Sequence, residues 1–275
     1  MSQEEDLDSS SAPLIEHLIE LRQRLFYAVL AIFFFFIVCF IFANQIFNIL
    51  VIPYERAAGE NADLLLIFTA PQEFFFVQIK IAFFGALFIA FPIVAAQLYK
   101  FVAPGLYRNE RQAFLPFLIA TPILFVLGAC LVYFLIMPLA MNFFLSMQQA
   151  GDASRPTIEL LPRVSEYLGL VMTLIFAFGI MFQLPVIITL LAKADLVSVA
   201  TLKTKRKYAV VFAFIAAAVL TPPDPVSQIG LAVPTLLLYE LSIFSARLVE
   251  KKRQEEREKR EGSLGSASDS DAAVS

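Results

Sequence analysis

Charged residues are scarce in this chain. They make up 16% of its 275 residues, whereas soluble globular proteins carry about 25%. The shortage excludes an extensive water-facing surface, in agreement with a mean hydropathy of +0.75. The few charges gather at the two ends and in short clusters between long apolar runs, and no stretch between these runs is long enough for a soluble domain. The sequence therefore predicts an integral membrane protein.

Residues typical of catalytic and metal sites are also scarce. The single histidine, His17, precedes the first apolar run, so neither a Ser–His pair nor a metal–histidine cluster is expected within the bilayer. The motifs GxxxxGK[ST], HExxH, CxxC and GxSxG are absent from the sequence. The two cysteines, Cys39 and Cys130, are expected to be small buried hydrophobic residues, with a disulfide as the alternative. No catalytic residue, metal or cofactor is predicted.

The apolar runs predict six transmembrane helices. A spanning helix needs about 20 largely apolar residues, and four runs meet this length. The last two runs are shorter and flank a proline-rich break, so they are predicted to form a hairpin of short helices that thins the bilayer locally or leans on its neighbours. The predicted spans are 24–46, 74–98, 113–138, 166–192, 208–221 and 228–246, within a transmembrane domain at 14–246 that separates a disordered acidic segment at 1–13 from a charged, disordered tail at 247–275.

Prolines recur inside the predicted spans. Each one removes a backbone donor and bends its helix, although membrane helices also tolerate proline without a special role. We therefore expect an all-α bundle that is kinked and concave, with its last two helices short. The prolines are Pro92, Pro116, Pro122, Pro185 and Pro234.

The distribution of lysine and arginine predicts the orientation in the membrane. Seventeen of the 21 lie in the N-terminal segment, the loops after the second and fourth spans, and the tail. The opposite loops, 47–73 and 141–166, contain three arginines and are long enough for short surface helices. Since positive loops stay inside, both termini are predicted to be cytoplasmic. The polar, acidic start does not resemble a cleavable secretory signal, so the first run is interpreted as an uncleaved anchor.

Polar side chains within the predicted spans are candidates for function, because they are costly in lipid. Gln183 lies deep in the fourth span beside Pro185, and Glu240 lies within the sixth. Asp224 and Gln228 lie near the tip of the predicted hairpin. The alternative for Gln183 is an ordinary inter-helix hydrogen bond, worth about 1 kcal/mol.

Two predicted cytoplasmic segments carry carboxylates among bases. HLIELRQRL, at 17–25, has leucines at steps of three and four residues, which predicts an amphipathic helix that runs into the first span. FVAPGLYRNER, at 101–111, is a short loop after the second span. On composition alone, Glu20 and Glu110 are loop carboxylates that pair with nearby arginines.

These two segments, together with FGIMFQLP in the fourth span and LTPPDPVSQ between the fifth and sixth, resemble the TatC family in the same order along the chain. The resemblance runs from about residue 12 to residue 250. TatC proteins are the multi-spanning receptor subunits of the twin-arginine protein translocase. The resemblance implies a receptor in the bacterial inner membrane for folded cargo proteins whose signal peptides carry paired arginines, with export driven by the proton gradient.

The resemblance also implies a signal-peptide site. In the family, two cytoplasmic carboxylates bind the arginine pair, and they match Glu20 and Glu110 here, with Phe101 and Arg22 at the same surface. A guanidinium fork binds a carboxylate through two charge-assisted bonds, which lysine does not reproduce. The alternative is that both acids only pair with their neighbours Arg22, Arg24, Arg108 and Arg111.

Partner contacts follow from the same resemblance. The family has a buried acid in the fourth span where this chain has Gln183, an amide that cannot carry a titrating charge. The implied partners are single-span proteins of the TatA and TatB kinds, further copies of this chain and the lipid bilayer, but no nucleic acid. Glu240, Gln228 and Tyr133, with Pro222, Pro223 and Asp224 at the outer hairpin tip, are the remaining candidates for contacts and assembly.

Two other classes of protein fit the sequence less well. Intramembrane polar groups and prolines also suit a secondary transporter of a small solute, but repeated halves are not evident in the sequence. An intramembrane hydrolase would need a nucleophile–base pair, and none is found in the spans.

Overall fold

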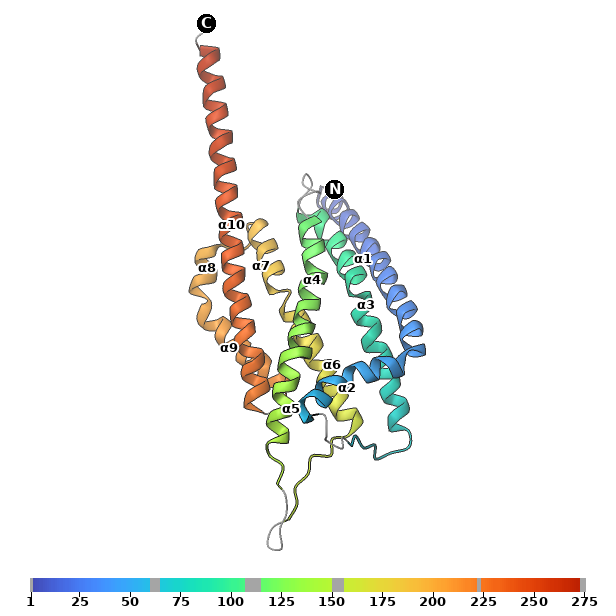
Figure 1. Cartoon of the computed structure of the whole chain (residues 1–275). Coiled ribbons are helices and arrows are strands. Elements are labelled where there is room, and N and C mark those ends of the chain that lie inside the picture. Colours follow the sequence, from blue (N-terminus) through green and yellow to red (C-terminus); the bar gives the residue numbers. More distant parts are fainter. Residues whose placement is uncertain (1, 60–64, 107–114, 150–155, 222–223, 273–275) are drawn as a thin grey trace. The chain divides into compact units, whose positions relative to one another are not determined.

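The computed structural model describes residues 2–59, 65–106, 115–149, 156–221 and 224–272, and every regular element in these ranges is a helix. The prediction of an all-α fold is confirmed. The elements, labelled in Figure 1, are α1 (Ser2–Ile41), α2 (Ala43–Ala58), α3 (Glu73–Leu106), α4 (Leu115–Leu131), the π-helical η2 (Val132–Ile136), α5 (Met137–Leu145), α6 (Val164–Met181), α7 (Leu184–Lys193), α8 (Val199–Thr204), α9 (Arg206–Leu220) and α10 (Pro225–Ala272).

Among the described residues, five helical segments are long and apolar enough to cross a membrane. The fifth predicted span corresponds to α9, which has 15 residues. At 1.5 Å per residue α9 is about 22 Å long, whereas the hydrocarbon core is about 30 Å thick. A sixth crossing therefore stays a prediction that depends on local thinning of the bilayer. The five segments are His17–Ile41, Glu73–Phe101, Pro116–Leu145, Val164–Lys193 and Pro225–Glu255.

The chain forms two compact units, Met1–Gly179 and Ile180–Ser275. In the first unit α1 and α3 run antiparallel and pack along each other (Figure 1). The first span ends at Ile41, before the predicted end at residue 46, because Phe42 departs from helical angles and α2 takes a new direction. The change of direction buries one face of α2, which includes Leu50 and Tyr54. Burial also raises the pKa of the Tyr54 phenol.

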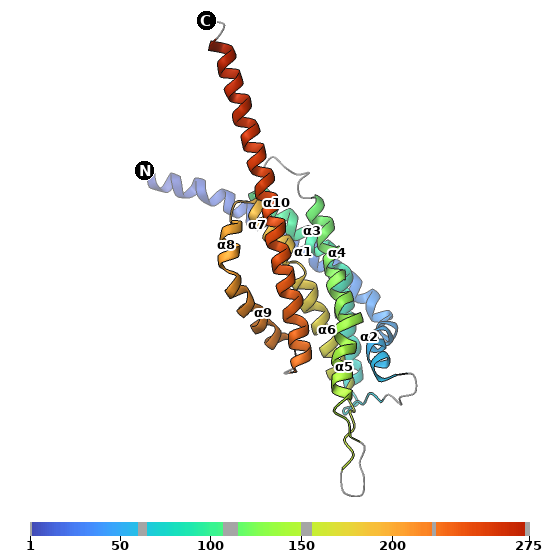
Figure 2. The same ribbon diagram turned by 60° about the vertical axis from the view of Figure 1, so that its left-hand side comes forward.

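The third span is a continuous rod made of α4, η2 and α5 (Figures 1 and 2). It continues to Leu145, beyond the predicted end at residue 138. The π-helical turn lies directly before Pro138, whose ring lacks the N–H that an α-helix would offer to the carbonyl of Phe134. A wider turn at this place accommodates the proline without ending the helix.

The core of the first unit depends on a close approach of α4 and α6. A Cβ added at Gly128 would lie 2.8 Å from the carbonyl oxygen of Phe178, so this contact requires glycine. On the other side of the contact, a Cβ at Gly179 would lie 2.4 Å from the ring of Phe125. That ring stacks on Phe91 of α3 with centroids 3.8 Å apart and also meets Phe176 of α6, which links three helices in one aromatic cluster.

The second unit consists of α7, α8, α9 and α10, and α10 extends well beyond the other three (Figures 1 and 2). Buried side chains of α7, α8 and α10 form its core, and Asp195 ends α7 in the left-handed region with φ 62°. The Asp195 carboxylate pairs with Arg253, which fixes the end of α7 against α10. The core residues are Ala192, Val199, Leu202, Ile243 and Ala246.

Proline interrupts the helices at one of the predicted places. The fourth span breaks between Met181 and Leu184, just before Pro185, whereas Pro122 and Pro234 lie inside helices that continue. Pro92 lies likewise within α3. The concave shape of the bundle stays a prediction.

In the structure α1 begins at Ser2 and α10 continues to Ala272, and the disorder of the segments 1–13 and 247–275 stays a prediction. Each segment extends a long apolar helix, and a helix that has already formed gains one backbone hydrogen bond for each residue added. The stretch after Lys251 is also rich in Glu, Lys and Arg, which have high helix propensity.

Candidate functional site

The start of the first span meets the end of the second through an aromatic contact. The His17 ring of α1 stacks on the Phe101 ring of α3, with centroids 4.3 Å apart and planes within 15°. The contact follows from the antiparallel packing of α1 and α3, which brings residues 84 positions apart in sequence side by side. Sequence reasoning used His17 to exclude catalytic sites and as the start of the segment HLIELRQRL, and it did not predict this contact.

Glu20 lies one helical turn after His17 on the same face of α1. Its side chain is 31% exposed, and its Oε1 accepts a bond of 3.2 Å from Nη2 of Arg24. This i,i+4 pair is part-buried. The predicted alternative, that Glu20 pairs with a neighbouring arginine, is therefore seen, and the bond engages only Oε1 of the carboxylate.

The structure brings some predicted site residues together and leaves others apart. Phe101 forms the stack with His17, and Glu20 lies one helical turn from His17 on the same face of α1. Arg22 is exposed. Because it lies two positions after Glu20, it points away from the face of α1 that carries Glu20. Glu110 lies outside the described residues.

Gln183 occupies the break between α6 and α7. It is 8% exposed, and its backbone N–H donates to the carbonyl of Ile180 while its own carbonyl accepts from the N–H of Ile187, both at 2.9 Å. The amide therefore lies in a buried interruption of the span, not on a regular helical turn. Its side chain has hydrogen-bonding capacity but no charge to titrate.

Glu240 pairs with the first residue of α9. Its Oε2 accepts a bond of 2.6 Å from Nη2 of Arg206, and both side chains are about half exposed. Since Arg206 is the first residue of α9, Glu240 lies beside the N-terminal end of that short helix and not beside its middle. The neighbouring Tyr239 donates its hydroxyl to the carbonyl of Leu202 at 2.8 Å, which ties α10 to α8.

Asp224, at the predicted hairpin tip, caps α10. It is 4% exposed, and its Oδ1 accepts the backbone N–H of Ser227 at 2.7 Å. Gln228 follows in the same turn, where its N–H donates to the Asp224 carbonyl at 3.1 Å. This is an N-cap with Pro225 at the first helical position. The other tip residues, Pro222 and Pro223, lie outside the described residues.

Tyr133 connects η2 to α2 through a backbone acceptor. Its hydroxyl donates to the carbonyl of Ile49 at 2.7 Å. Pro53, four residues later in α2, lacks the N–H that would otherwise bond this carbonyl. Tyr167 of α6 donates similarly to the carbonyl of Leu50 at 2.9 Å. Sequence reasoning missed Tyr167 and Pro53. A proline within an amphipathic helix does indicate, however, that the carbonyl four residues earlier lacks its usual N–H donor.

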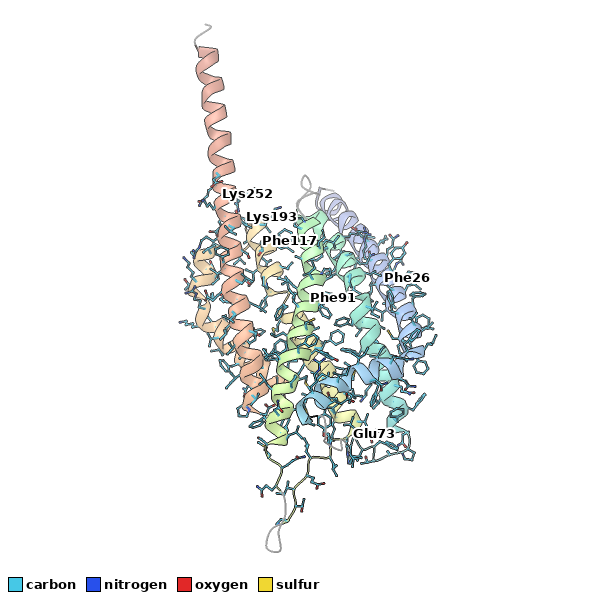
Figure 3. All side chains as sticks on the ribbon, in the orientation of Figure 1. Phe26, Glu73, Phe91, Phe117, Lys193 and Lys252 are labelled. Carbon is cyan, nitrogen blue, oxygen red and sulfur yellow. The ribbon has the colours of Figure 1, made fainter. Side chains whose placement is uncertain are left out.

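Glu73 is a further residue that sequence reasoning missed. Figure 3 shows it where α3 begins, at the end of the first unit that also carries both long loops. Its carboxylate accepts from the Ser165 hydroxyl at 2.5 Å and from the Thr69 N–H at 2.8 Å. Nearby, the N–H of Val164 donates to the carbonyl of Ile67 at 2.9 Å, so the two loops are joined through backbone as well.

A metal centre is not supported within the described part of the chain, where no three His, Cys, Asp or Glu residues lie close enough to hold an ion. The cysteines Cys39 and Cys130 are free thiols.

Comparison with known proteins gives one consistent result. Residues 16–234 match the family described as Sec-independent protein translocase protein (TatC). The chain is 52% identical over 245 residues to the protein of that name from Magnetococcus marinus, covering 89% of this chain and 88% of the relative. It is 35% identical over 235 residues to the Escherichia coli K12 protein, covering 86% and 88%. A crystal structure of the twin-arginine translocase receptor TatC superposes with a TM-score of 0.73 at 36% identity, covering 85% of this chain and 99% of that one.

Proposed function

Because the chain belongs to the TatC family of Sec-independent protein translocase proteins, we propose that Glu20 and Glu110 form its receptor site for the paired arginines of a cargo signal peptide. The chain is a subunit of the twin-arginine translocase, with a transport function rather than a catalytic one. Beyond this family function, the proposal names the residues that recognise the cargo.

The observation that carries the proposal is the contact of His17 with Phe101. It places the Glu20 face of α1 at the end of α3, directly before the segment that contains Glu110. A signal peptide bound there would meet one carboxylate from α1 and one from the segment after α3. Phe101 would offer an apolar ring beside them.

The chemistry of the two carboxylates favours arginine over lysine. Each guanidinium donates two parallel hydrogen bonds to one carboxylate, whereas an ammonium is a point charge without that geometry. The bond from Arg24 to one oxygen of Glu20 would be exchanged for a bidentate one when the peptide binds. Discrimination between paired arginines and paired lysines is the expected consequence.

The partner subunits and the orientation complete the proposal. We infer single-span partners of the TatA and TatB kinds, and both termini in the cytoplasm, as the lysine and arginine distribution predicts. Gln183 and Glu240 remain candidates for partner contacts. Since Gln183 is an amide, coupling to the proton gradient would not use a titrating side chain at that place.

Binding of a fluorescent signal peptide to the full chain in lipid nanodiscs tests the site. Glu20→Gln keeps the shape of the side chain but removes its charge, and hydrogen bonds to charged groups are worth about 1.5–3 kcal/mol. The dissociation constant of a twin-arginine peptide should therefore rise by about 10- to 100-fold. Glu110→Gln should have an effect of similar size.

Two variants serve as controls. Glu166→Gln removes a carboxylate at the other end of the first unit, where Glu166 pairs with Arg163 at 3.7 Å, and should leave binding unchanged. Arg24→Gln frees Glu20 and should not weaken binding. Unchanged affinity in both Glu20→Gln and Glu110→Gln would move the recognition site elsewhere, without affecting the family assignment.

A further inference from the structure

A groove opens in the second unit between α7, α9 and α10, with a volume of about 300 Å³. All of its lining residues belong to that unit. Its walls are apolar and aromatic over most of their length, with Leu184 and Ile188 from α7 opposite Phe212 of α9. The remaining lining residues are Lys205, Tyr208, Ala209, Thr235, Leu236 and Tyr239.

The mouth of the groove is basic. Lys205 lines it at the junction of α8 and α9, and its Nζ lies 5.1 Å from the centre of the Tyr208 ring. The Nζ of Lys207 lies 5.2 Å from the same ring, so two ammonium groups flank one aromatic side chain. Both lysines are exposed, and among the described residues neither belongs to an ion pair. Glu240, the acid that meets the start of α9, is already paired with Arg206.

The groove combines apolar walls with lysines at one end, as an amphiphile with an anionic headgroup requires. From Lys205 to Phe212 the wall formed by α9 rises about 10 Å. An α-helix with its side chains is about 10 Å across. An extended hydrocarbon chain is narrower and would contact the apolar side chains on three sides.

The position of the basic mouth also suits a lipid headgroup. It lies at the first turn of α9, next to Lys203, within the lysine-rich loop that is predicted to face the cytoplasm. Basic pockets between membrane helices on that side bind anionic headgroups, with about 1 kcal/mol from each lysine. Since α9 has only 15 residues, a bound lipid would also cover a place where the bilayer must thin.

We propose that this groove binds an anionic glycerophospholipid, with one acyl chain between α7, α9 and α10 and the phosphate at Lys205 and Lys207. The Tyr208 ring, which lies near both ammonium groups, would contact the glycerol region. The proposal is independent of the signal-peptide site, because it concerns the other unit of the chain.

Native mass spectrometry of the full chain with dioleoyl phosphatidylglycerol or dioleoyl phosphatidylcholine tests the headgroup contact. The wild type should retain phosphatidylglycerol preferentially, since the two lipids differ only in their headgroups. The double variant Lys205→Gln with Lys207→Gln should lower that retention about 30-fold, since each lysine contributes about 1 kcal/mol. Lys100→Gln with Lys252→Gln removes the same charge from two exposed lysines that neither line the groove nor lie in the lysine-rich loop, and should change retention little.

A second pair of variants tests the chain contact. Ala209→Leu fills the groove and should reduce retention of phosphatidylglycerol, whereas Ala216→Leu, two turns later on α9 and outside the lining, should not. Phosphatidylglycerol with a diazirine on its acyl chain should label the peptides that contain Phe212 and Leu236.

Several outcomes would overturn the proposal. They are equal retention of the two lipids by the wild type, equal loss in the two double variants, and unchanged retention in Ala209→Leu. A photoreactive residue placed at Phe212 that crosslinks, in native membranes, only to a protein and never to phosphatidylglycerol would identify a partner helix as the occupant instead.

Discussion

At the scale of single residues, the hydroxyl of Tyr133 takes over a hydrogen bond that Pro53 cannot provide. The carbonyl of Ile49 has no N–H partner four residues later, and Tyr133 donates to it at 2.7 Å from another helix. An intramolecular hydrogen bond of this kind contributes about 0.5–1.5 kcal/mol to stability. The proline therefore makes α2 depend on η2 for its position.

Tyr133→Phe should lower the free energy of unfolding by about 1 kcal/mol. In a Pro53→Ala background the loss should be smaller, because the introduced alanine offers its own N–H to the Ile49 carbonyl. A double-mutant cycle measured by denaturation in detergent checks this coupling. Tyr27→Phe, at an exposed tyrosine of α1, is the matched control. An equal loss in both backgrounds would show that the bond does not compensate for the proline.

Asp224 is a second residue whose role is local. As the N-cap of α10 its Oδ1 accepts the N–H of Ser227 at 2.7 Å. Asp224→Ala should destabilise the second unit by about 1 kcal/mol, while Asp224→Asn, which keeps the acceptor, should cost much less. Thermal unfolding monitored by circular dichroism distinguishes the two. Equal destabilisation by both variants would indicate that the negative charge matters more than the cap.

At the scale of helices, two glycines set the distance between α4 and α6. Gly128 has the Phe178 carbonyl 2.8 Å from the place of a Cβ, and Gly179 has the Phe125 ring at 2.4 Å, whereas Gly169, also in α6, has nothing within 4 Å. Replacement by alanine should therefore change the free energy of unfolding in opposite directions at Gly128 and Gly169.

Gly128→Ala should destabilise the chain by about 1–3 kcal/mol, since overpacking forces the two helices apart. Gly169→Ala should stabilise it by about 0.5–1 kcal/mol, because alanine has less conformational freedom to lose in a helix. Unfolding midpoints of the two variants in the same detergent check both signs. A neutral Gly128→Ala would mean that the helices separate without loss of packing.

The helices themselves were largely predictable. Apolar runs of about 20 residues identify four of the five spans with boundaries that differ by a few residues, because hydropathy reports directly on lipid exposure. The end of α1 at Ile41 was not predictable, since the apolar run continues through Phe42 and only the buried face of α2 requires a new direction. The break at Gln183 carries a proline signal that Pro122 and Pro234 carry as well, so proline alone did not identify it.

At the scale of the whole molecule, hydropathy and motif order identified the membrane class and the family, whereas the arrangement of the site needed the structure. The stack of His17 on Phe101 joins residues from different spans, and no local pattern predicts which turn of α1 meets the end of α3. The basic groove of the second unit was equally hidden, because its lining comes from three helices. Side chains that act together across helices are therefore the part that sequence reasoning missed.

The central claim is that Glu20 and Glu110 recognise paired arginines, and site-specific photocrosslinking tests it most directly. A photoreactive residue would replace Glu20 or Glu110 in turn, in membranes that contain the whole translocase and a cargo precursor. A precursor with a twin-arginine signal should crosslink from both positions, and one with two lysines instead should crosslink from neither. Equal crosslinking of both precursors, or none from either position, would contradict the account and place the recognition surface elsewhere on the chain.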